Sequence, residues 1–259
     1  MYKFLKVSEN GPVGEMRLNR PEVRNAFNQE LIAEIDAAAR WFDQQRHIKI
    51  VLLSGEGLSF CSGFDLKQFS STADPAEVRA TVDAGRRMVQ SVQKMRTITV
   101  AAVQGSCVGG GVVLMAACDF RLAAESARLS LPETDIGIPL AWGGVPALVR
   151  EAGALFAADF ILNCRPVEAH EALQRGLVGS VFPDGELRGR AEALAHRLAR
   201  HSALVLEATK AQLVAASQSL CPDAYAFSDA HVLHSALLDP ASQQARERYL
   251  EQLKAAAAA

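Results

Sequence analysis

The chain has 259 residues, of which 49% are hydrophobic, and its 27 basic and 29 acidic residues leave it nearly neutral. This length fits one large domain, or one domain with a helical extension, and allows a full hydrophobic core. Nucleic acid is excluded as a partner because no basic stripe with interleaved aromatic residues occurs. The five cysteines are dispersed without paired spacing, which argues against a disulfide framework or a zinc site and indicates reduced thiols.

The start of the sequence shows no signal-peptide pattern, and no apolar run reaches the roughly eighteen residues that a membrane span needs. We therefore expect a cytoplasmic protein with no membrane partner.

The first two thirds of the chain repeats one theme: a short β-rich run, a loop and then a helical pattern. The run "VGEMRLN" precedes a helix predicted over 29–45, with Asn28 as its N-cap. The apolar run "IKIVLLSG" has strand length and leads through "EGLSFCSGFDLKQF" to a helix predicted over 75–95. "TITVAAVQG" repeats the strand signal and leads into a glycine-rich segment.

Beyond that segment, "FRLAA" and "ARLSL" are typical of short strands, and the chain after Gly143 is mostly helical, interrupted by the strand-like "GLVGSVFP". Buried strands separated by helices favour an α/β core, and the helical tail forms a second layer on it. The tail fits packing and subunit contact equally well. Amphipathic helices are predicted over 187–200, 203–217, 224–238 and 240–254.

Three consecutive glycines, Gly109, Gly110 and Gly111, stand where an apolar helix begins. Without Cβ atoms they let a ligand approach the backbone, and the first N–H groups of a helix have no partner inside it. This pattern predicts an anion-binding turn. The alternative is that the glycines only let the helix pack closely on a strand.

A second loop places Ser62 and Gly63 between a buried strand and a helix. One N–H donor from each of the two loops would form an oxyanion hole for a thioester or another carbonyl whose oxygen gains negative charge. In the alternative interpretation, Ser62 and Gly63 form a simple turn and Asp65 caps the helix that follows.

Several long motifs together resemble the crotonase family, the enoyl-CoA hydratase/isomerase superfamily, over essentially the whole chain: "LNRPEVRNAFN", "VLLSGEGLSFCSGFDLKQF" and "AAVQGSCVGGGVVLMAACDFRLAAESARLSLPETDIGI". The resemblance implies an α/β fold, a spiral of ββα units with a C-terminal α-helical trimerisation region. It implies a core with the acyl-CoA site over 1–195 and an oligomerisation region over 196–259. The expected assembly is a homotrimer or a dimer of trimers.

The resemblance also implies an acyl-CoA thioester substrate. Coenzyme A is then part of the substrate, so no separate cofactor is expected. The family's oxyanion N–H groups fall on Ser62 and Gly110. Residues expected to contact coenzyme A or the substrate are Arg24, Ala26, Phe64, Asp65, Leu66, Gly109, Val113, Leu140 and Trp142.

Family members that hydrate 2-enoyl-CoA hold water with two glutamates. This chain keeps one, Glu133, in "LPETD", but has Val113 at the position of the other. Valine neither accepts a proton nor orients water, so two-carboxylate hydration is compromised, while Glu133 alone can still carry a proton between two carbons. The resemblance to single-glutamate isomerases of the family predicts a shift of a 3-enoyl-CoA double bond to 2-enoyl-CoA.

Apolar neighbours would exclude water from Glu133 and raise the basicity of its carboxylate. Asp135 is the rival base, and Glu133 could instead be a surface acid or a helix cap. The alternative functions are a hydratase working with one carboxylate and a non-catalytic acyl-CoA-binding protein. The neighbours expected around Glu133 are Val113, Ile136, Ile138, Leu140 and Trp142.

The sequence lacks the residues that metal-dependent, nucleophilic, dehalogenase and decarboxylase chemistry would need. His231 and His234 share a helical spacing without a third ligand, which argues against a metal site. Cys61 has no neighbouring histidine in the sequence and is interpreted as a buried thiol. No "GxSxG" motif occurs, which argues against a serine hydrolase. Ala141 and Leu140 stand near the positions where the dehalogenase and decarboxylase branches of the family use aspartate or tyrosine.

Overall fold

The structure of the protein, a computed structural model, describes residues 2–65, 74–226 and 228–258. In these residues one sheet has the strand order β1-β2-β3-β4-β6-β9 and a smaller sheet has the order β5-β7-β8. The pairs β1–β2 and β7–β8 are antiparallel, and all other neighbours run parallel. The strands are β1 (Leu5–Asn10), β2 (Val13–Leu18), β3 (Ile50–Gly55), β4 (Ile98–Val103), β5 (Ser106–Val108), β6 (Phe120–Ala124), β7 (Arg128–Ser130), β8 (Val167–Glu168) and β9 (Ser180–Phe182).

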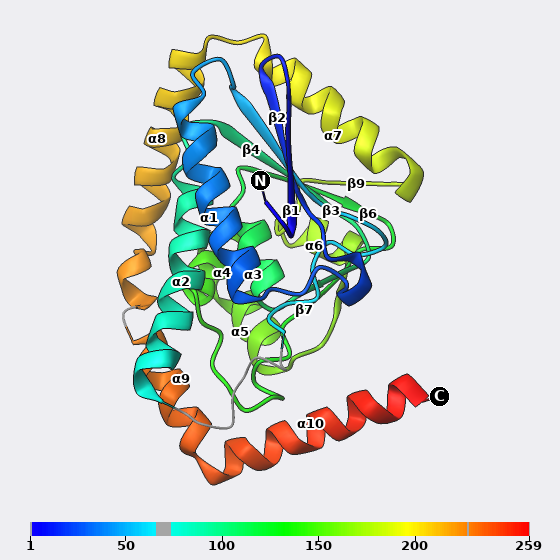
Figure 1. Cartoon of the computed structure of the whole chain (residues 1–259), viewed down its shortest axis with the longest axis vertical. Coiled ribbons are helices and arrows are strands. Elements are labelled where there is room, and N and C mark those ends of the chain that lie inside the picture. The colour runs from blue at the N-terminus through cyan, green and yellow to red at the C-terminus, as the bar shows by residue number, and fades with distance from the viewer. Residues whose placement is uncertain (1, 66–73, 227, 259) are drawn as a thin grey trace.

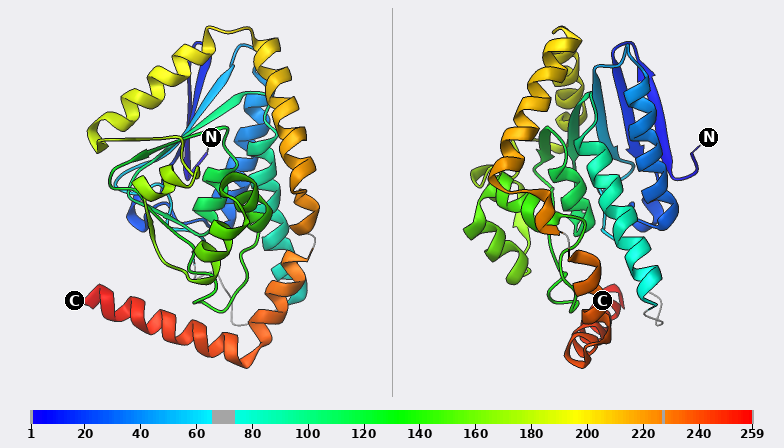
Figure 2. Two further views of the ribbon diagram at one scale, coloured as in Figure 1. Left: turned by 180° about the vertical axis from the view of Figure 1, so that it is seen from behind. Right: turned by 90° about the vertical axis from the view of Figure 1, so that its left-hand side faces the viewer.

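Helices cover both faces of the larger sheet (Figures 1 and 2). The α/β prediction is therefore confirmed. The α-helices are α1 (Gln29–Gln44), α2 (Pro75–Gln93), α3 (Gly110–Ala116), α4 (Gly144–Ala152), α5 (Ala154–Leu162), α6 (Ala169–Gln174), α7 (Asp184–Ala199), α8 (Ala203–Leu220), α9 (Asp229–Leu238) and α10 (Pro240–Ala258).

The central strands β3 and β4 are mostly apolar on both sides because each face of the sheet packs against a helix layer. On one face, Val51 and Leu53 of β3 belong to the main core with residues of α1, α2 and α3. On the other face, Ile50 and Leu52 pack with the inner residues of α7. Alternation along a strand thus supplies both cores, which is why these strands read as continuous apolar runs in the sequence.

The two long helices of the first half begin where the sequence predicts. Asn28 caps α1, and its side-chain oxygen accepts the N–H of Leu31 at 2.8 Å. Asp74 caps α2 by accepting the N–H of Ala76 at 2.9 Å, with Pro75 as the first helical residue. Both caps satisfy N–H groups that have no partner inside the helix.

The C-terminal helices wrap around one side and one end of the molecule. In Figure 1, α8 runs along the side of the fold, α9 continues from it, and α10 turns at Pro240 and crosses the lower end. Lys210 anchors α8 to the core, since its buried ammonium group donates to Asp119 at 2.7 Å and to the Thr97 carbonyl at 2.9 Å. None of the helices in the described part of the chain is long and apolar enough to cross a bilayer.

Two details of the sequence-based prediction are wrong. The helix expected over 224–238 is divided, because a 3-10 turn covers Asp223–Ala226 and α9 starts at Asp229. The glycine-rich segment was expected to be a loop before a helix, but it contains the short strand β5, which pairs with β7. This pairing fixes the position of Gly109, which directly follows the strand.

Candidate functional site

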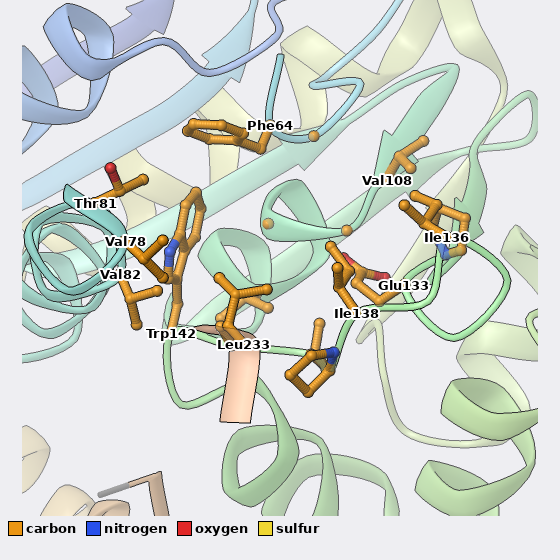
Figure 3. Close-up of a pocket in the computed structure, with 18 of the residues that line it drawn as sticks. Phe64, Val78, Thr81, Val82, Val108, Glu133, Ile136, Ile138, Trp142 and Leu233 are labelled. Atoms are coloured by element: carbon orange, nitrogen blue, oxygen red, sulfur yellow. The ribbon is translucent and has the colours of Figure 1, made fainter. Parts of the chain in front are cut away.

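A cavity of about 670 Å³ brings together segments that are far apart in the sequence. Its wall consists of the loop after β3, the turn between β5 and α3, the chain from Pro132 to Trp142, and parts of α2, α9 and α10. In Figure 3, Glu133 lies beside Ile136 and Ile138 on one side, and Trp142 lies near α2 on the other. The predicted site residues that line it are Arg24, Ser62, Phe64, Gly109, Gly110, Val113, Glu133, Leu140 and Trp142.

The three glycines are needed because each lies against a different neighbour. A Cβ atom on Gly109 would lie 2.5 Å from Oε1 of Glu133, and a Cβ atom on Gly111 would lie 2.9 Å from Cβ of Cys61. A Cβ atom on Gly110 would overlap with the indole of Trp142. Gly109 also has φ of +53°, a conformation that L-residues rarely adopt. The bare backbone therefore accommodates both the carboxylate and the indole.

Glu133 is held in the cavity wall by a tight turn. Its carbonyl accepts the N–H of Ile138 at 2.9 Å, and the carbonyl of Pro132 accepts the N–H of Ile136 at 2.9 Å. The side-chain Oε2 is shielded from solvent and has no hydrogen-bond partner in the described residues. A buried carboxylate oxygen without a partner is costly in a folded protein and marks a functional group.

Burial raises the pKa of Glu133 from its usual 4.5 to about 7, and a hydrogen bond from its own backbone N–H opposes part of this shift. The cause is desolvation, because the charged form loses hydration among apolar neighbours. Near neutral pH this carboxylate can therefore both accept and return a proton. The neighbours expected from the sequence all line the cavity: Val113, Ile136, Ile138, Leu140 and Trp142.

The rival base, Asp135, is exposed and does not line the cavity. Its charge raises the pKa of Cys164, which is shifted mainly by burial, and adds to the raised pKa of Tyr249. Although the two residues are only two positions apart in the turn, the carboxylate of Glu133 lines the cavity and that of Asp135 is exposed. Of the two, only Glu133 faces the space where a ligand fits.

The predicted pairing of Ser62 with Gly110 as oxyanion donors needs correction at Ser62. The N–H of Ser62 donates to the carbonyl of Arg24 at 2.9 Å, so this donor is already used. Gly110, the first residue of α3, has no acceptor for its N–H in the part of the chain that the structure describes.

The next residues of this loop alternate in direction. Phe27 donates to the carbonyl of Gly63 at 2.8 Å and accepts the N–H of Asp65 at 2.9 Å. In an extended segment the N–H of the residue between those two points the other way. The N–H of Phe64 therefore faces away from Phe27.

The residues expected to receive coenzyme A are only partly at the cavity. Arg24 is exposed, lines the cavity and has a left-handed φ of +52°. Ala26 is buried, and its carbonyl accepts a hydrogen bond from Arg20 at 2.6 Å. Neither Ala26 nor Asp65 lines the cavity, and Leu66 lies outside the described residues. Their contact with coenzyme A stays a prediction.

Sequence reasoning did not identify which residues of α2 and the C-terminal helices form the wall. It left packing and subunit contact open for the helical tail, and within one chain Leu233, Leu237, Tyr249 and Leu253 line the cavity. Leu238 is 56% exposed and Leu253 is 46% exposed. The hydrophobic stripe indicated that these residues are covered, but a stripe does not identify what covers it. The missed lining residues include Val78, Thr81, Val82, Leu233, Leu237, Tyr249 and Leu253.

Tyr249 of α10 is the polar member of this missed wall. Burial raises the pKa of its hydroxyl, and the negative charge of Glu133 raises it further, so the two groups lie within electrostatic range. The sequence holds them 116 positions apart (249 minus 133), and no local motif connects them.

The remaining candidates from the sequence are the thiol of Cys61 and the side chains that could bind a metal ion. Cys61 is fully buried, its thiol donates to the Asn25 carbonyl at 3.1 Å, and burial raises its pKa to about 12. Such a thiol is inert, which confirms the structural interpretation. Within the described residues no group of three or more His, Cys, Asp or Glu side chains could hold a metal ion.

Comparison with known proteins shows which family the chain is similar to. The model of the family described as "Enoyl-CoA hydratase/isomerase" matches residues 8–257. The chain is 35% identical to a "Probable enoyl-CoA hydratase" of Rhizobium meliloti, over 78% of this chain and 77% of the relative. It is 30% identical to a peroxisomal "Delta(3,5)-Delta(2,4)-dienoyl-CoA isomerase" of Arabidopsis thaliana, over 82% of each chain.

A solved structure supports the fold independently. The chain superposes on an enoyl-CoA hydratase/isomerase from Pseudoalteromonas atlantica with a TM-score of 0.85 and 27% identity. The match covers 96% of this chain and 98% of the other. The likeness therefore includes the C-terminal helices that close the cavity.

Proposed function

The chain belongs to the enoyl-CoA hydratase/isomerase family, the crotonase superfamily, and from this premise we propose that it moves the double bond of a 3-enoyl-CoA to the 2 position. The observation that carries the proposal is Glu133: a single shielded carboxylate with a pKa of about 7, facing an apolar cavity. A group with this pKa can take a proton at one carbon and return it at another.

The proposed reaction uses Glu133 as a proton shuttle. Its carboxylate removes the proton from the α carbon, and the electrons of that C–H bond form a dienolate with the negative charge on the thioester oxygen. The protonated Glu133 then delivers the proton to the γ carbon, and the double bond forms between the α and β carbons. Proton and electrons balance without a cofactor, and coenzyme A enters as part of the substrate.

Stabilisation of the dienolate oxygen is assigned to backbone donors of the two loops that meet at the cavity. Gly110 supplies one N–H. For the other we propose Phe64 in place of Ser62, because its N–H points away from Phe27, whereas the N–H of Ser62 is already bound to the carbonyl of Arg24. Donors aimed at developing charge typically contribute about 3 kcal/mol each.

Val113 favours isomerisation over hydration. It is buried in α3 and lines the cavity, so it presents a hydrocarbon surface where a second carboxylate would hold water. A dry site also protects the dienolate from competing protonation by solvent. The alternative is a hydratase that works with Glu133 alone, which the name of the Rhizobium relative favours. A non-catalytic acyl-CoA-binding protein is the third candidate.

The test is turnover of a 3-enoyl-CoA, followed by the absorbance of the conjugated 2-enoyl thioester. We expect absorbance to rise with the wild type and with the control Asp135→Asn, and turnover to fall about a thousandfold or more in Glu133→Gln, which keeps the shape but cannot accept the proton. Loss of absorbance from a 2-enoyl-CoA would instead support the hydratase. Binding without either change would support the binding protein.

A further inference from the structure

The indole of Trp142 separates two hollows of unequal size. On one side it lines the large cavity that contains Glu133. On the other side it lines a small hollow of about 10 Å³ between α2, α4 and the segment at Ala226, which offers the space of roughly one water molecule. In the part of the chain that the structure describes, no other residue lines both hollows, so Trp142 is the residue at which they adjoin.

Two glycines leave the space that this indole fills. A Cβ atom on Gly85, inside α2, would overlap with Cε2 and Nε1 of the indole. A Cβ atom on Gly110 would overlap with its six-membered ring. Glycine is unfavourable inside a helix relative to alanine, so Gly85 is explained by the indole and not by the helix.

The backbone holds Trp142 in a strained position. Its φ of +63° is rare for a bulky residue. The following Gly143 donates its N–H to Asp229 of α9 at 3.0 Å, which fixes the turn. The ring is also packed edge-on against Phe27 and Phe64, with centroid distances of 5.6 and 6.2 Å. Such strain persists where the surroundings require one arrangement.

We propose that Trp142 is a specificity-determining residue that sets the length of acyl chain the protein accepts. The indole adjoins Gly110, where the thioester would bind, and contacts Gly85 of α2, beyond which the small hollow lies. Figure 3 shows the ring beside this helix. The acyl chain must therefore run toward α9 and α10, where Leu237 and Leu253 line the remaining space. Gly85 leaves the space in α2 that the indole occupies.

The inference uses the proposed function only in assuming that an acyl-CoA occupies the cavity. It is tested by binding, with saturated straight-chain acyl-CoA thioesters of 4 to about 16 carbons that cannot isomerise. Affinity should increase about fourfold for each methylene that finds apolar space and stop increasing where the chain meets a wall. Titration calorimetry gives this chain-length limit for each variant.

Trp142→Ala should join the two hollows and move the chain-length limit upward by several carbons. Trp142→Phe keeps an aromatic ring and should disturb folding less than Trp142→Ala. It should move the chain-length limit upward by less. Gly85→Ala should move it downward, since the new methyl group pushes the indole into the cavity. The double variant Gly85→Ala/Trp142→Ala should behave as Trp142→Ala, because the methyl group then has nothing to displace.

Gly189→Ala is the matched control, because Gly189 also lies inside a helix, α7, and has no atom within 4 Å of its Cβ position. It should leave the limit unchanged. An unchanged limit in Trp142→Ala and in Trp142→Phe would overturn the proposal. So would a Gly85→Ala effect that persists without the indole, or a wild type that binds no acyl-CoA. A wild type that binds these thioesters but does not isomerise would refute only the proposed reaction.

Discussion

On the Glu133 side of the cavity, backbone pairing holds the groups that would touch the thioester, whereas on the far side apolar side chains of α2, α9 and α10 form the wall. The carbonyl of Glu133 and the loop from Ser62 to Asp65 are tied by hydrogen bonds between 2.8 and 2.9 Å. The far wall is joined mainly by contacts such as those of Leu233 and Leu237 within the main core. On this division, the Glu133 side would determine the chemistry at the thioester, and the wall of α2, α9 and α10 would determine which acyl chains fit.

This difference predicts that small changes on the Glu133 side have large effects. Gly109→Ala places a methyl group 2.5 Å from Oε1 of Glu133, at a φ of +53°. Displacing a catalytic group by about 1 Å can lower the rate roughly a hundredfold. Turnover of 3-enoyl-CoA by the folded variant measures the effect. Gly11→Ala is the control, because φ is +57° there but nothing lies within 4 Å; an equal loss in both variants would assign the effect to strain alone.

The next effect is the pH dependence of the same side. Glu133 must be ionised to remove the proton, and its pKa is about 7. Below that pH, kcat/KM should fall about tenfold for each pH unit, and above it the rate should level off. A rate profile between pH 5 and 9 measures the midpoint. A midpoint near the ordinary glutamate value would show that the carboxylate is hydrated when the protein works.

Val113→Glu tests why the second carboxylate is absent. The new carboxyl would be buried beside Glu133 and would raise its pKa by about one unit, which lowers isomerisation about fivefold at pH 7. Because two carboxylates can hold a water molecule, hydration of 2-enoyl-CoA should increase. Val113→Gln is a matched control that adds polarity without charge. Isomerisation at the wild-type rate in the glutamate variant would place Val113 outside the reacting space.

The sequence pointed to Glu133 through the resemblance of "LPETD" to the family motif, and to the glycines because three of them stand where an apolar helix begins. It was not informative about which loop N–H is already used, since that depends on where Arg24 and Phe27 pair with residues near position 63. Helix bounds followed from caps such as Asn28, whereas β5 is too short to show a periodicity. The position of Tyr249 depends on how α10 packs, which no local pattern encodes.

Tyr249→Phe is expected to have the smallest effect, and it tests whether the far wall takes part in proton transfer. The Tyr249 hydroxyl lies within electrostatic range of Glu133 and makes no hydrogen bond within the described residues. If substrate binding turns its O–H toward the carboxylate, it stabilises the charged form and lowers the pKa of Glu133. Removing the hydroxyl then raises the midpoint of the pH–rate profile by a fraction of a unit and lowers the rate at pH 7 about twofold. Tyr225→Phe, at a position 67% exposed, is the control and should change neither. If the midpoint of the pH–rate profile stays unchanged or moves down, α10 contributes only apolar contacts to the site.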